Sequence, residues 1–192
     1  MENRPVSEQM RDAANVLATA DEIFSAEEVR AAFDRLAREI TDDLAEANPV
    51  VLAVMTGGVV PAVRLQCRFN FLHQLDYVHA TRYRGGTHGG ELEWLARPRT
   101  PLKGRTVLIV DDILDEGATL AAIQQMCREA GANRVCTAVL TLKLHDRRVP
   151  GVSADYVGLE VPDRYVFGAG MDYGEYLRNV NGIFALAARE DE

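Results

Sequence analysis

The stretch from Val107 to Leu120 constrains the fold of this chain more than any other. An apolar, β-branched run is cut off by Asp111 and Asp112, Asp115 follows three residues later, and a Gly-Ala-Thr turn then opens a helical spacing. Apolar runs of this length, bounded by turn residues, are typical of a strand buried on both faces in a parallel sheet. A buried charge is costly unless it is paired or bound to a metal ion. We therefore expect both acids at the carboxyl end of the strand, where open α/β sheets place their ligands.

Helices and strands alternate along the rest of the chain. Helices are expected at 7–24, with Ser7 as the cap, at 59–69, and from Leu120 to Gly131. A further helix is expected to begin at the capping box of Ser25 and Glu28 and to end at Asn48-Pro49. Strands are expected at 50–55, 75–84, 91–96, 106–110, 134–142, 156–159 and 164–167. The Gly-rich run 85–90 is expected to be a mobile loop, and 173–188 shows no clear period. The alternation predicts a parallel sheet with right-handed crossovers.

Length and composition narrow the class of protein. A chain of 192 residues is typical of one domain with a core of its own. The net charge of -8 argues against general nucleic-acid binding, and no apolar run reaches the roughly 18 residues that span a bilayer. The first residues contain no apolar signal region, and the cysteines are scattered without CxxC spacing. We expect a cytoplasmic protein whose partners include neither nucleic acid nor a membrane.

The residues that follow the central apolar run suit a phosphate group. Asp115-Glu116-Gly117-Ala118-Thr119 supplies backbone N–H groups at a helix N-terminus, a glycine that permits close approach, and a hydroxyl. The pattern lacks the spacing of a Walker A loop. The adjacent acids can accept hydrogen bonds from sugar hydroxyls or assist Mg²⁺ binding. The stretch therefore indicates a site for a ribose 5-phosphate, whereas the plainer interpretation of an Asp-Asp pair alone is a solvated turn.

The full pattern Asp-Asp-x-x-Asp-x-Gly-x-Thr between a strand and a helix resembles the phosphoribosyl pyrophosphate motif of phosphoribosyltransferases. The best match is the hypoxanthine-guanine phosphoribosyltransferase family, over about Val50 to Arg178. The resemblance implies one α/β domain over 1–192, with a mainly parallel sheet flanked by helices. Its core would cover about 50–150, and a small hood would come from about 1–20 and 151–192. Relatives are commonly dimers or tetramers, so a homodimer or homotetramer is expected by analogy.

The resemblance assigns the donor site residue by residue. It implies a phosphoribosyl site of Asp111, Asp112, Asp115, Glu116, Gly117, Ala118 and Thr119, a pyrophosphate site of Thr56, Gly57, Gly58, Tyr83 and Arg178, and Mg²⁺ at Asp111, Asp112 and Asp172. In the family the loop at Thr56 often contains a cis peptide. Three positions depart from the family pattern, because relatives often carry Lys in place of Thr56, Ser in place of Arg82 and a small hydroxyl residue in place of Glu116. The plainer alternatives are an ordinary turn at the Gly pair and a simple linker around Tyr83.

The same resemblance places the purine. Lys143 would donate to the exocyclic O6, Tyr165 would stack on the ring, and the backbone of Val166, helped by a carbonyl near Asp172, would contact the base edge. An ammonium only donates hydrogen bonds and would meet another donor in the amino group of adenine, so Lys143 favours 6-oxopurines. Without the resemblance, Lys143 would be an ordinary surface lysine, and Tyr165 and Val166 a buried strand.

Asp115 is the expected general base. As the purine attacks C1′ and pyrophosphate leaves, the imidazole ring of the purine must lose a proton, and a neighbouring carboxylate can accept it. The four histidines, at 73, 79, 88 and 145, share no metal-ligand spacing and are expected to be ordinary surface or core residues.

We therefore expect an enzyme that transfers a 5-phosphoribosyl group to hypoxanthine or guanine with Mg²⁺, forming IMP or GMP and pyrophosphate. Two alternatives remain open at this point. One is the same transfer to xanthine or another base, since xanthine shares the 6-oxo group. The other is a regulator that binds phosphoribosyl pyrophosphate without turnover, against which stand the presence of both Asp115 and Asp172 and the lack of an attached DNA-binding domain.

Overall fold

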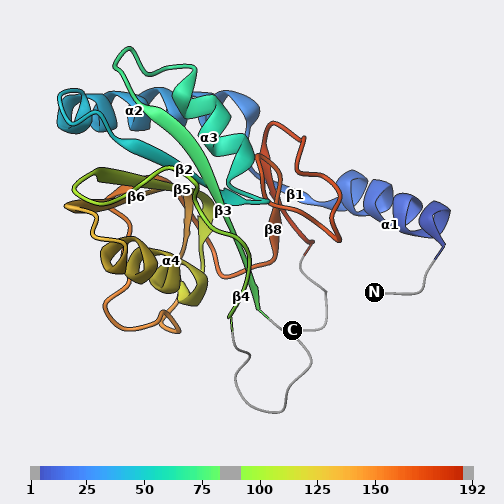
Figure 1. Ribbon diagram of the computed structural model, residues 1–192. Helices are drawn as coiled ribbons and strands as arrows, with labels where there is room; N and C mark the ends of the chain where they lie inside the picture. Colours follow the sequence, from blue (N-terminus) through green and yellow to red (C-terminus); the bar gives the residue numbers. More distant parts are fainter. Residues whose placement is uncertain (1–4, 83–91, 188–192) are drawn as a thin grey trace.

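The centre of the molecule is a six-stranded sheet in the order β4-β3-β2-β5-β6-β7 (Figure 1). The computed structural model describes residues 5–82 and 92–187. The strands are β2 (Val50–Met55), β3 (Gln74–Arg82), β4 (Leu92–Ala96), β5 (Thr106–Leu114), β6 (Arg134–Lys143) and β7 (Tyr156–Val161). Every neighbouring pair is parallel except β3 and β4, which are antiparallel. The expected mainly parallel sheet is confirmed.

Helices cover both faces of this sheet. Helices α2 (Ala26–Leu44) and α3 (Val59–Gln66) lie on one face, and α4 (Ala118–Glu129) lies on the other (Figure 1). Alternate residues of the central strands point to the two sides: Val51 and Leu108 pack in the cluster that contains α2, whereas Val50 and Ile109 pack in the cluster that contains α4. Burial on both faces explains why the strands are continuous apolar runs.

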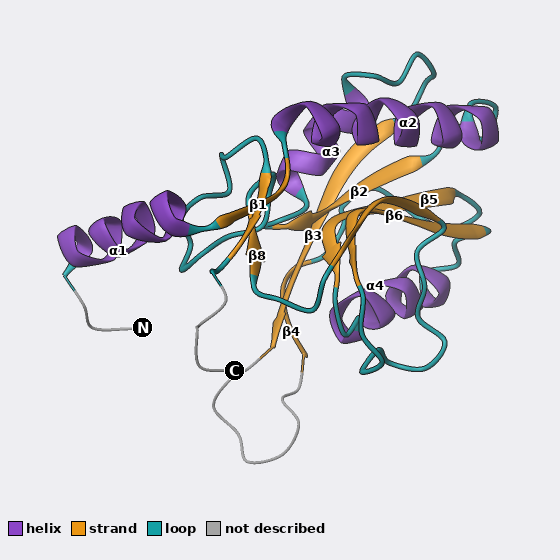
Figure 2. Cartoon of the chain, turned by 180° about the vertical axis from the view of Figure 1, so that it is seen from behind, coloured by secondary structure: helices purple, strands orange, loops and turns teal. Residues whose placement is uncertain are grey.

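The two N-terminal helices differ in how they begin. The expected capping box of α2 is confirmed, because the Ser25 hydroxyl accepts from the Glu28 N–H while the Glu28 carboxylate accepts from the Ser25 N–H. Helix α1 (Val6–Thr19) begins one residue before Ser7, with Pro5 in the cap position and no side-chain cap, so the expected Ser7 cap is wrong. Only Ala13 of α1 is buried, and the helix projects away from both sheets (Figure 1, Figure 2). No helix in the described ranges has the length and apolar character needed to cross a membrane.

A second, three-stranded antiparallel sheet joins segments from both ends of the chain. It has the order β1-β9-β8 and consists of β1 (Asp21–Phe24), β9 (Ile183–Ala185) and β8 (Val166–Phe167). The prediction of helix for 21–24 is therefore wrong, and the tail without a clear period contains a short strand. Strand β7 falls in the range 151–192 expected for the hood, yet it belongs to the six-stranded sheet. We call the small sheet with its connections the hood.

Strand β5 is longer than expected and contains the two acids. It continues through Asp111 and Asp112 to Leu114, and Asp112 is 9% exposed. The expected end of the strand at Val110 is therefore wrong, and the acids lie inside its carboxyl-terminal half. The pairing of the neighbouring strands explains why β5 can contain Asp111 and Asp112. Strand β2 pairs with β5 only as far as Val110, whereas β6 pairs with β5 to Leu114. Beyond Val110 one edge of β5 is open, and the acids lie at that edge.

Candidate active site

A cavity of about 360 Å³ lies where β5 passes into the N-terminus of α4. Its walls comprise Val54, Met55, Gly57 and Ala80 together with every residue from Asp111 to Leu120. All seven residues expected to bind the phosphoribosyl group therefore line one cavity, together with Gly57 from the expected pyrophosphate site. This arrangement can hold a phosphate at the helix N-terminus and carboxylates beside it.

The turn before α4 depends on Gly117. Its φ of +83° lies in the left-handed region, and a Cβ at this position would lie 2.9 Å from side-chain carbons of Leu114 and Val152. Glycine is the residue that adopts this conformation without strain. The adjoining Glu116 is exposed, and its carbonyl accepts the Val149 N–H at 2.8 Å. Gly117 and the first residues of α4 line the cavity, so the positive end of the helix dipole faces it.

The loop after β2 lies directly against Asp112. The peptide between Met55 and Thr56 is cis, in the place where the family resemblance implies one. A Cβ on Gly57 would lie 1.9 Å from the Asp112 carboxylate, and one on Gly58 would lie 2.5 Å from the Val110 carbonyl. Both glycines are thus required by close packing rather than by turn geometry alone. Thr56 is exposed beside the cavity.

Asp111 and Asp112 are suited to a divalent cation. Burial raises the pKa of Asp111 well above its ordinary value and the charge of Asp112 raises it further, while burial also raises the pKa of Asp112. The charge of Arg178 acts to lower both pKa values but does not outweigh burial, so a cation at this pair would further favour the ionised carboxylates. Within the described ranges no three His, Cys, Asp or Glu residues gather to hold a metal ion. Mg²⁺ is commonly held by one or two carboxylates together with substrate phosphates, so the pair fits this ion.

The segment 168–178 brings Arg178 to the same place. Gly170, with φ of +120°, packs so closely that a Cβ would lie 2.6 Å from the Gly57 carbonyl. The Arg178 guanidinium donates to the Gly170 carbonyl at 2.9 Å and forms an ion pair with Asp172 at 2.8 Å. Arg178 therefore lies next to the loop expected to bind pyrophosphate. The Asp172 carboxylate faces Arg178 and does not line the cavity.

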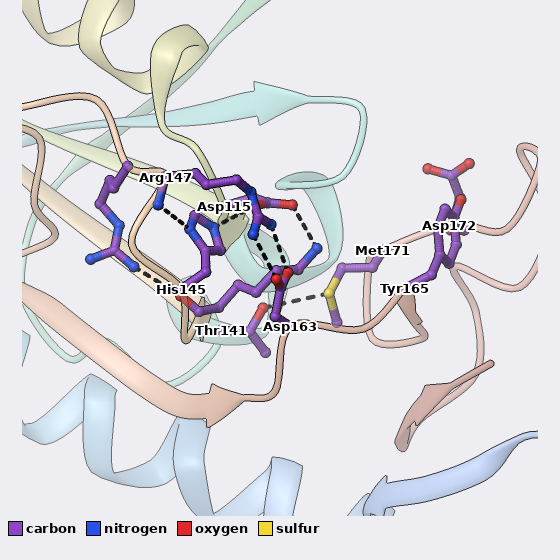
Figure 3. Close-up of polar contacts among 10 residues, drawn as sticks. Asp115, Thr141, His145, Arg147, Asp163, Tyr165, Met171 and Asp172 are labelled. Carbon is purple, nitrogen blue, oxygen red and sulfur yellow. Dashed lines mark hydrogen bonds and ion pairs between the residues drawn. The ribbon is translucent and has the colours of Figure 1, made fainter. Parts of the chain in front are cut away.

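Asp115 forms a compact cluster with two basic side chains (Figure 3). The Lys143 ammonium lies 2.6 Å from Oδ2 of Asp115, and Nε2 of His145 lies 2.7 Å from Oδ1. Burial acts to raise the pKa of Asp115, but the hydrogen bonds from Lys143 and His145 outweigh it, and the pKa is lowered. His145 was expected to be an ordinary residue and is instead part of this cluster.

The residues expected at the purine lie on the hood. Val166 is buried in β8, whereas the Tyr165 side chain is 49% exposed. The Tyr165 hydroxyl donates to the Asp172 carbonyl at 3.1 Å, which fixes the direction of the ring. Tyr165 and Asp172 lie apart from the cluster of Asp115 and His145 (Figure 3). Tyr83 and the Gly-rich run 85–90 lie outside the described residues.

Comparisons with known proteins agree with this arrangement. A family model described as a phosphoribosyl transferase domain matches residues 19–175. The hypoxanthine-guanine phosphoribosyltransferase of Streptococcus mutans is 33% identical over 165 residues, which cover 85% of this chain and 91% of that protein. The corresponding enzyme of Streptococcus pyogenes is 31% identical over the same shares.

The backbone of this chain is also similar to those of solved structures. A hypoxanthine-guanine phosphoribosyltransferase from Bacillus anthracis has a TM-score of 0.80 at 28% identity and covers 87% of this chain and 98% of its own. A hypoxanthine phosphoribosyltransferase from Trypanosoma cruzi, in complex with the product IMP, has a TM-score of 0.79 at 30% identity, over 88% of this chain and 92% of its own. A chain that shares this much sequence and backbone with those enzymes belongs to the phosphoribosyltransferase family, in the group of hypoxanthine-guanine phosphoribosyltransferases.

Proposed function

We propose that this purine phosphoribosyltransferase transfers the 5-phosphoribosyl group of phosphoribosyl pyrophosphate to hypoxanthine or guanine, forming IMP or GMP and pyrophosphate. The observation that carries the proposal is the contact between Asp115 and Lys143 beside the phosphate cavity. A carboxylate that accepts hydrogen bonds and an ammonium that donates them lie side by side there. A 6-oxopurine presents the matching pair on one edge, N7–H as donor and O6 as acceptor.

Binding of the purine would separate this ion pair. Lys143 would turn from Asp115 to O6, and Asp115 would receive the N7–H. The N9–C1′ bond would then form as the bond from C1′ to pyrophosphate breaks, and the N7 proton would pass to Asp115. Loss of the Lys143 hydrogen bond removes one of the contacts that lower the Asp115 pKa, so the carboxylate becomes a stronger base when the purine arrives.

The donor would bind across the cavity and the loop after β2. The N-terminus of α4 would hold the 5′-phosphate, and Asp111 and Asp112 would hold the ribose hydroxyls and Mg²⁺. When bound, Mg²⁺ supplies positive charge that neutralises the departing pyrophosphate. Gly57, Gly58 and Thr56 would contact pyrophosphate through the backbone, with Arg178 and Tyr83 as side-chain donors, and Asp172 would hold a second Mg²⁺ after release from Arg178.

Tyr165 would stack on the purine, and the backbone of Val166 would contact its edge. Half-exposed aromatic rings with a fixed direction are suited to stacking on flat ligands.

We further propose that the chain works in the cytoplasm as a single domain and as a homodimer or homotetramer. Sedimentation of the purified protein would measure the oligomeric state.

The test is an assay of nucleotide formation from five bases, each with and without Mg²⁺. We expect IMP and GMP from hypoxanthine and guanine, loss of product when Mg²⁺ is chelated, and no product from adenine or uracil. Xanthine is the informative additional base, because it shares the 6-oxo group and because one similar structure is named a hypoxanthine-guanine-xanthine phosphoribosyltransferase. Product from xanthine alone, or from adenine in preference to hypoxanthine, would overturn the assignment.

A further inference from the structure

The two ring nitrogens of His145 have different partners, and these define its protonation. Nδ1 lies 3.0 Å from the backbone nitrogen of Arg147, and Nε2 lies 2.7 Å from Oδ1 of Asp115. A backbone N–H can only donate, so Nδ1 must accept and carries no hydrogen. The hydrogen of a neutral imidazole then resides on Nε2 and is donated to Asp115. The side chain is 2% exposed, so water does not compete for these contacts.

His145 and Lys143 occupy different oxygens of Asp115. Lys143 contacts Oδ2 and His145 contacts Oδ1. In the proposed reaction Lys143 leaves Oδ2 for the purine, so Oδ2 becomes the proton acceptor. His145 has its second nitrogen bound to the backbone, and no step of the reaction requires it to move. Once Lys143 has turned, His145 is the side-chain contact that still fixes the plane of the carboxylate.

The loop that carries His145 is itself held at several points. Arg147 forms a two-pronged ion pair with Asp163, at 2.7 and 2.8 Å. The Leu144 N–H donates to the Val161 carbonyl at 2.9 Å, and Arg148 donates to the Lys143 carbonyl at 2.8 Å. These contacts join the loop to β6 and to the connection between β7 and the hood, where Asp163 lies two residues before Tyr165. Figure 3 shows the Asp115, His145 and Arg147 group together.

We propose that His145 is a positioning residue, which holds the Asp115 carboxylate so that Oδ2 accepts the N7 proton of the purine, and that the Arg147–Asp163 pair keeps His145 in place. This inference rests on the proposed function. A neutral imidazole suits the role because it orients the carboxylate without supplying a proton of its own or a full positive charge. The charged groups around it are Asp115 and Lys143 toward the cavity and Arg147 and Asp163 toward the hood.

The test compares His145→Leu with His145→Gln, whose amide places a donor near the position of Nε2. The readouts are the single-turnover rate, the KM of each substrate, the pH profile and the melting temperature. We expect His145→Leu to lower the single-turnover rate by about 10- to 100-fold, as small misplacements of catalytic groups do. The KM of phosphoribosyl pyrophosphate should stay within about two-fold, and His145→Gln should recover most of the rate.

The pH profile separates positioning from simple structural support. Loss of a donor to Asp115 raises its pKa, so the acid limb of the profile should move to higher pH in His145→Leu. His73→Leu is the matched control, because Nδ1 of His73 also contacts a backbone group two positions away, the Phe71 carbonyl, but His73 lies directly before β3, outside the cavity. It should lower the melting temperature without moving the profile. A native rate and profile in His145→Leu, or equal losses in the Leu and Gln variants, would overturn the proposal.

A readout without turnover keeps the two proposals distinct. ¹⁵N spectra of histidine-labelled protein, assigned through the His145→Gln variant, should give the Nε2–H tautomer for His145, with a shift when Asp115 is replaced by Asn. If the wild-type enzyme makes no nucleotide from any 6-oxopurine, the proposed function fails while the tautomer stands. If the Nδ1–H tautomer is found, the positioning role fails whatever the substrate.

Discussion

Asp115 is a carboxylate whose basicity depends on its neighbours. A general base works best with a pKa near the working pH, yet hydrogen bonds from Lys143 and His145 lower the pKa of Asp115 in spite of burial. The same hydrogen bonds favour the ionised carboxylate before the purine binds, so Asp115 is ready to accept a proton. Because one of the two donors is also the proposed partner of O6, binding of the correct base and activation of Asp115 become one event.

Asp115→Asn tests this residue directly. The amide keeps the shape of the side chain but cannot accept the proton, so we expect turnover to fall about 100-fold or more. The affinity for phosphoribosyl pyrophosphate, measured by calorimetry with Mg²⁺, should change little. Asp146→Asn is the control, because this substitution removes the same charge. Asp146 is an exposed acid of the loop that contains His145. Unchanged turnover in Asp115→Asn would remove Asp115 from the mechanism.

Gly57→Ala tests the contact between the loop after β2 and the acids of β5. The new Cβ would lie 1.9 Å from the Asp112 carboxylate, so Asp112 or the loop must move. Displacement by about 1 Å can cost about 100-fold in rate, and we expect the affinity for phosphoribosyl pyrophosphate to fall by about 10-fold or more. Gly104→Ala is the control: it strains a turn with φ of +73° where a Cβ has nothing within 4 Å. It should cost stability and spare the affinity.

Elements with a local signal could be predicted from the sequence. Strand β2 has the expected bounds, and α2 begins at its capping box. Strands β1 and β9 carry no such signal, because they are only four and three residues long and pair with each other across about 160 residues of sequence. The position of Asp111 and Asp112 within β5 depends on where the neighbouring strand stops, which is a property of the sheet rather than of the local sequence.

The residues of the candidate site also divide into those with a local sequence signal and those without one. The phosphoribosyl residues form one continuous motif, and the structure brings all of them to one cavity. His145 was missed because its partner Asp115 lies 30 positions earlier in the chain, and a single histidine after a strand has no distinctive spacing. Its signal is a three-dimensional one: a buried imidazole with a backbone donor on one nitrogen and a carboxylate on the other.

The start of α2 gives a test at the level of a helix. Ser25→Ala removes the capping hydroxyl and should lower the free energy of unfolding by about 1 kcal/mol. Ser7→Ala is the matched control, since Ser7 is an exposed residue inside α1 without a capping contact, and it should have little effect. Urea unfolding followed by circular dichroism measures both. Equal losses would show that the contact of Ser25 with Glu28 contributes nothing specific.

At the scale of the whole molecule, the proposed purine contacts come from both sheets, whereas the phosphate cavity belongs to the six-stranded sheet alone. Lys143 lies on β6, and the proposed purine contacts Tyr165 and Val166 belong to the hood. The connections 162–165 and 168–182 join the hood to the rest of the chain, and Val166, Met171 and Ile183 of the hood pack in the core cluster that contains α2. Damage to the hood should therefore affect the purine more than the phosphoribosyl donor.

The six-stranded sheet is tied to α2 through Asp43. Hydrogen bonds from Arg134 on β6, and then from Tyr156 on β7, lower the pKa of Asp43. A lowered folded-state pKa gives stability that is present above the unfolded value and is lost as the pH falls through the folded value. Asp43→Asn should therefore lose about 0.2–1 kcal/mol at neutral pH, and the difference from wild type should shrink toward about pH 3. Urea unfolding at both pH values, with the exposed neighbour Asp42→Asn as control, measures this, and a difference that stays constant would contradict the linkage.

Phe184→Ala tests the division between donor and acceptor sites. Phe184 stacks on the fully buried Phe167 with ring centroids 5.8 Å apart, and its strand β9 holds β1 and β8 together. Its removal should cost roughly 2 kcal/mol, less than the loss of a fully buried ring, and should loosen Tyr165. We expect the KM of hypoxanthine to rise about ten-fold while the affinity for phosphoribosyl pyrophosphate stays within about two-fold. Phe71→Ala is the matched control, because Phe71 also packs against another ring, Phe69 at 4.8 Å, but beside the large sheet. It should lower the melting temperature without changing the KM of hypoxanthine, and a parallel rise for both substrates in Phe184→Ala would mean that the two sheets act as one unit.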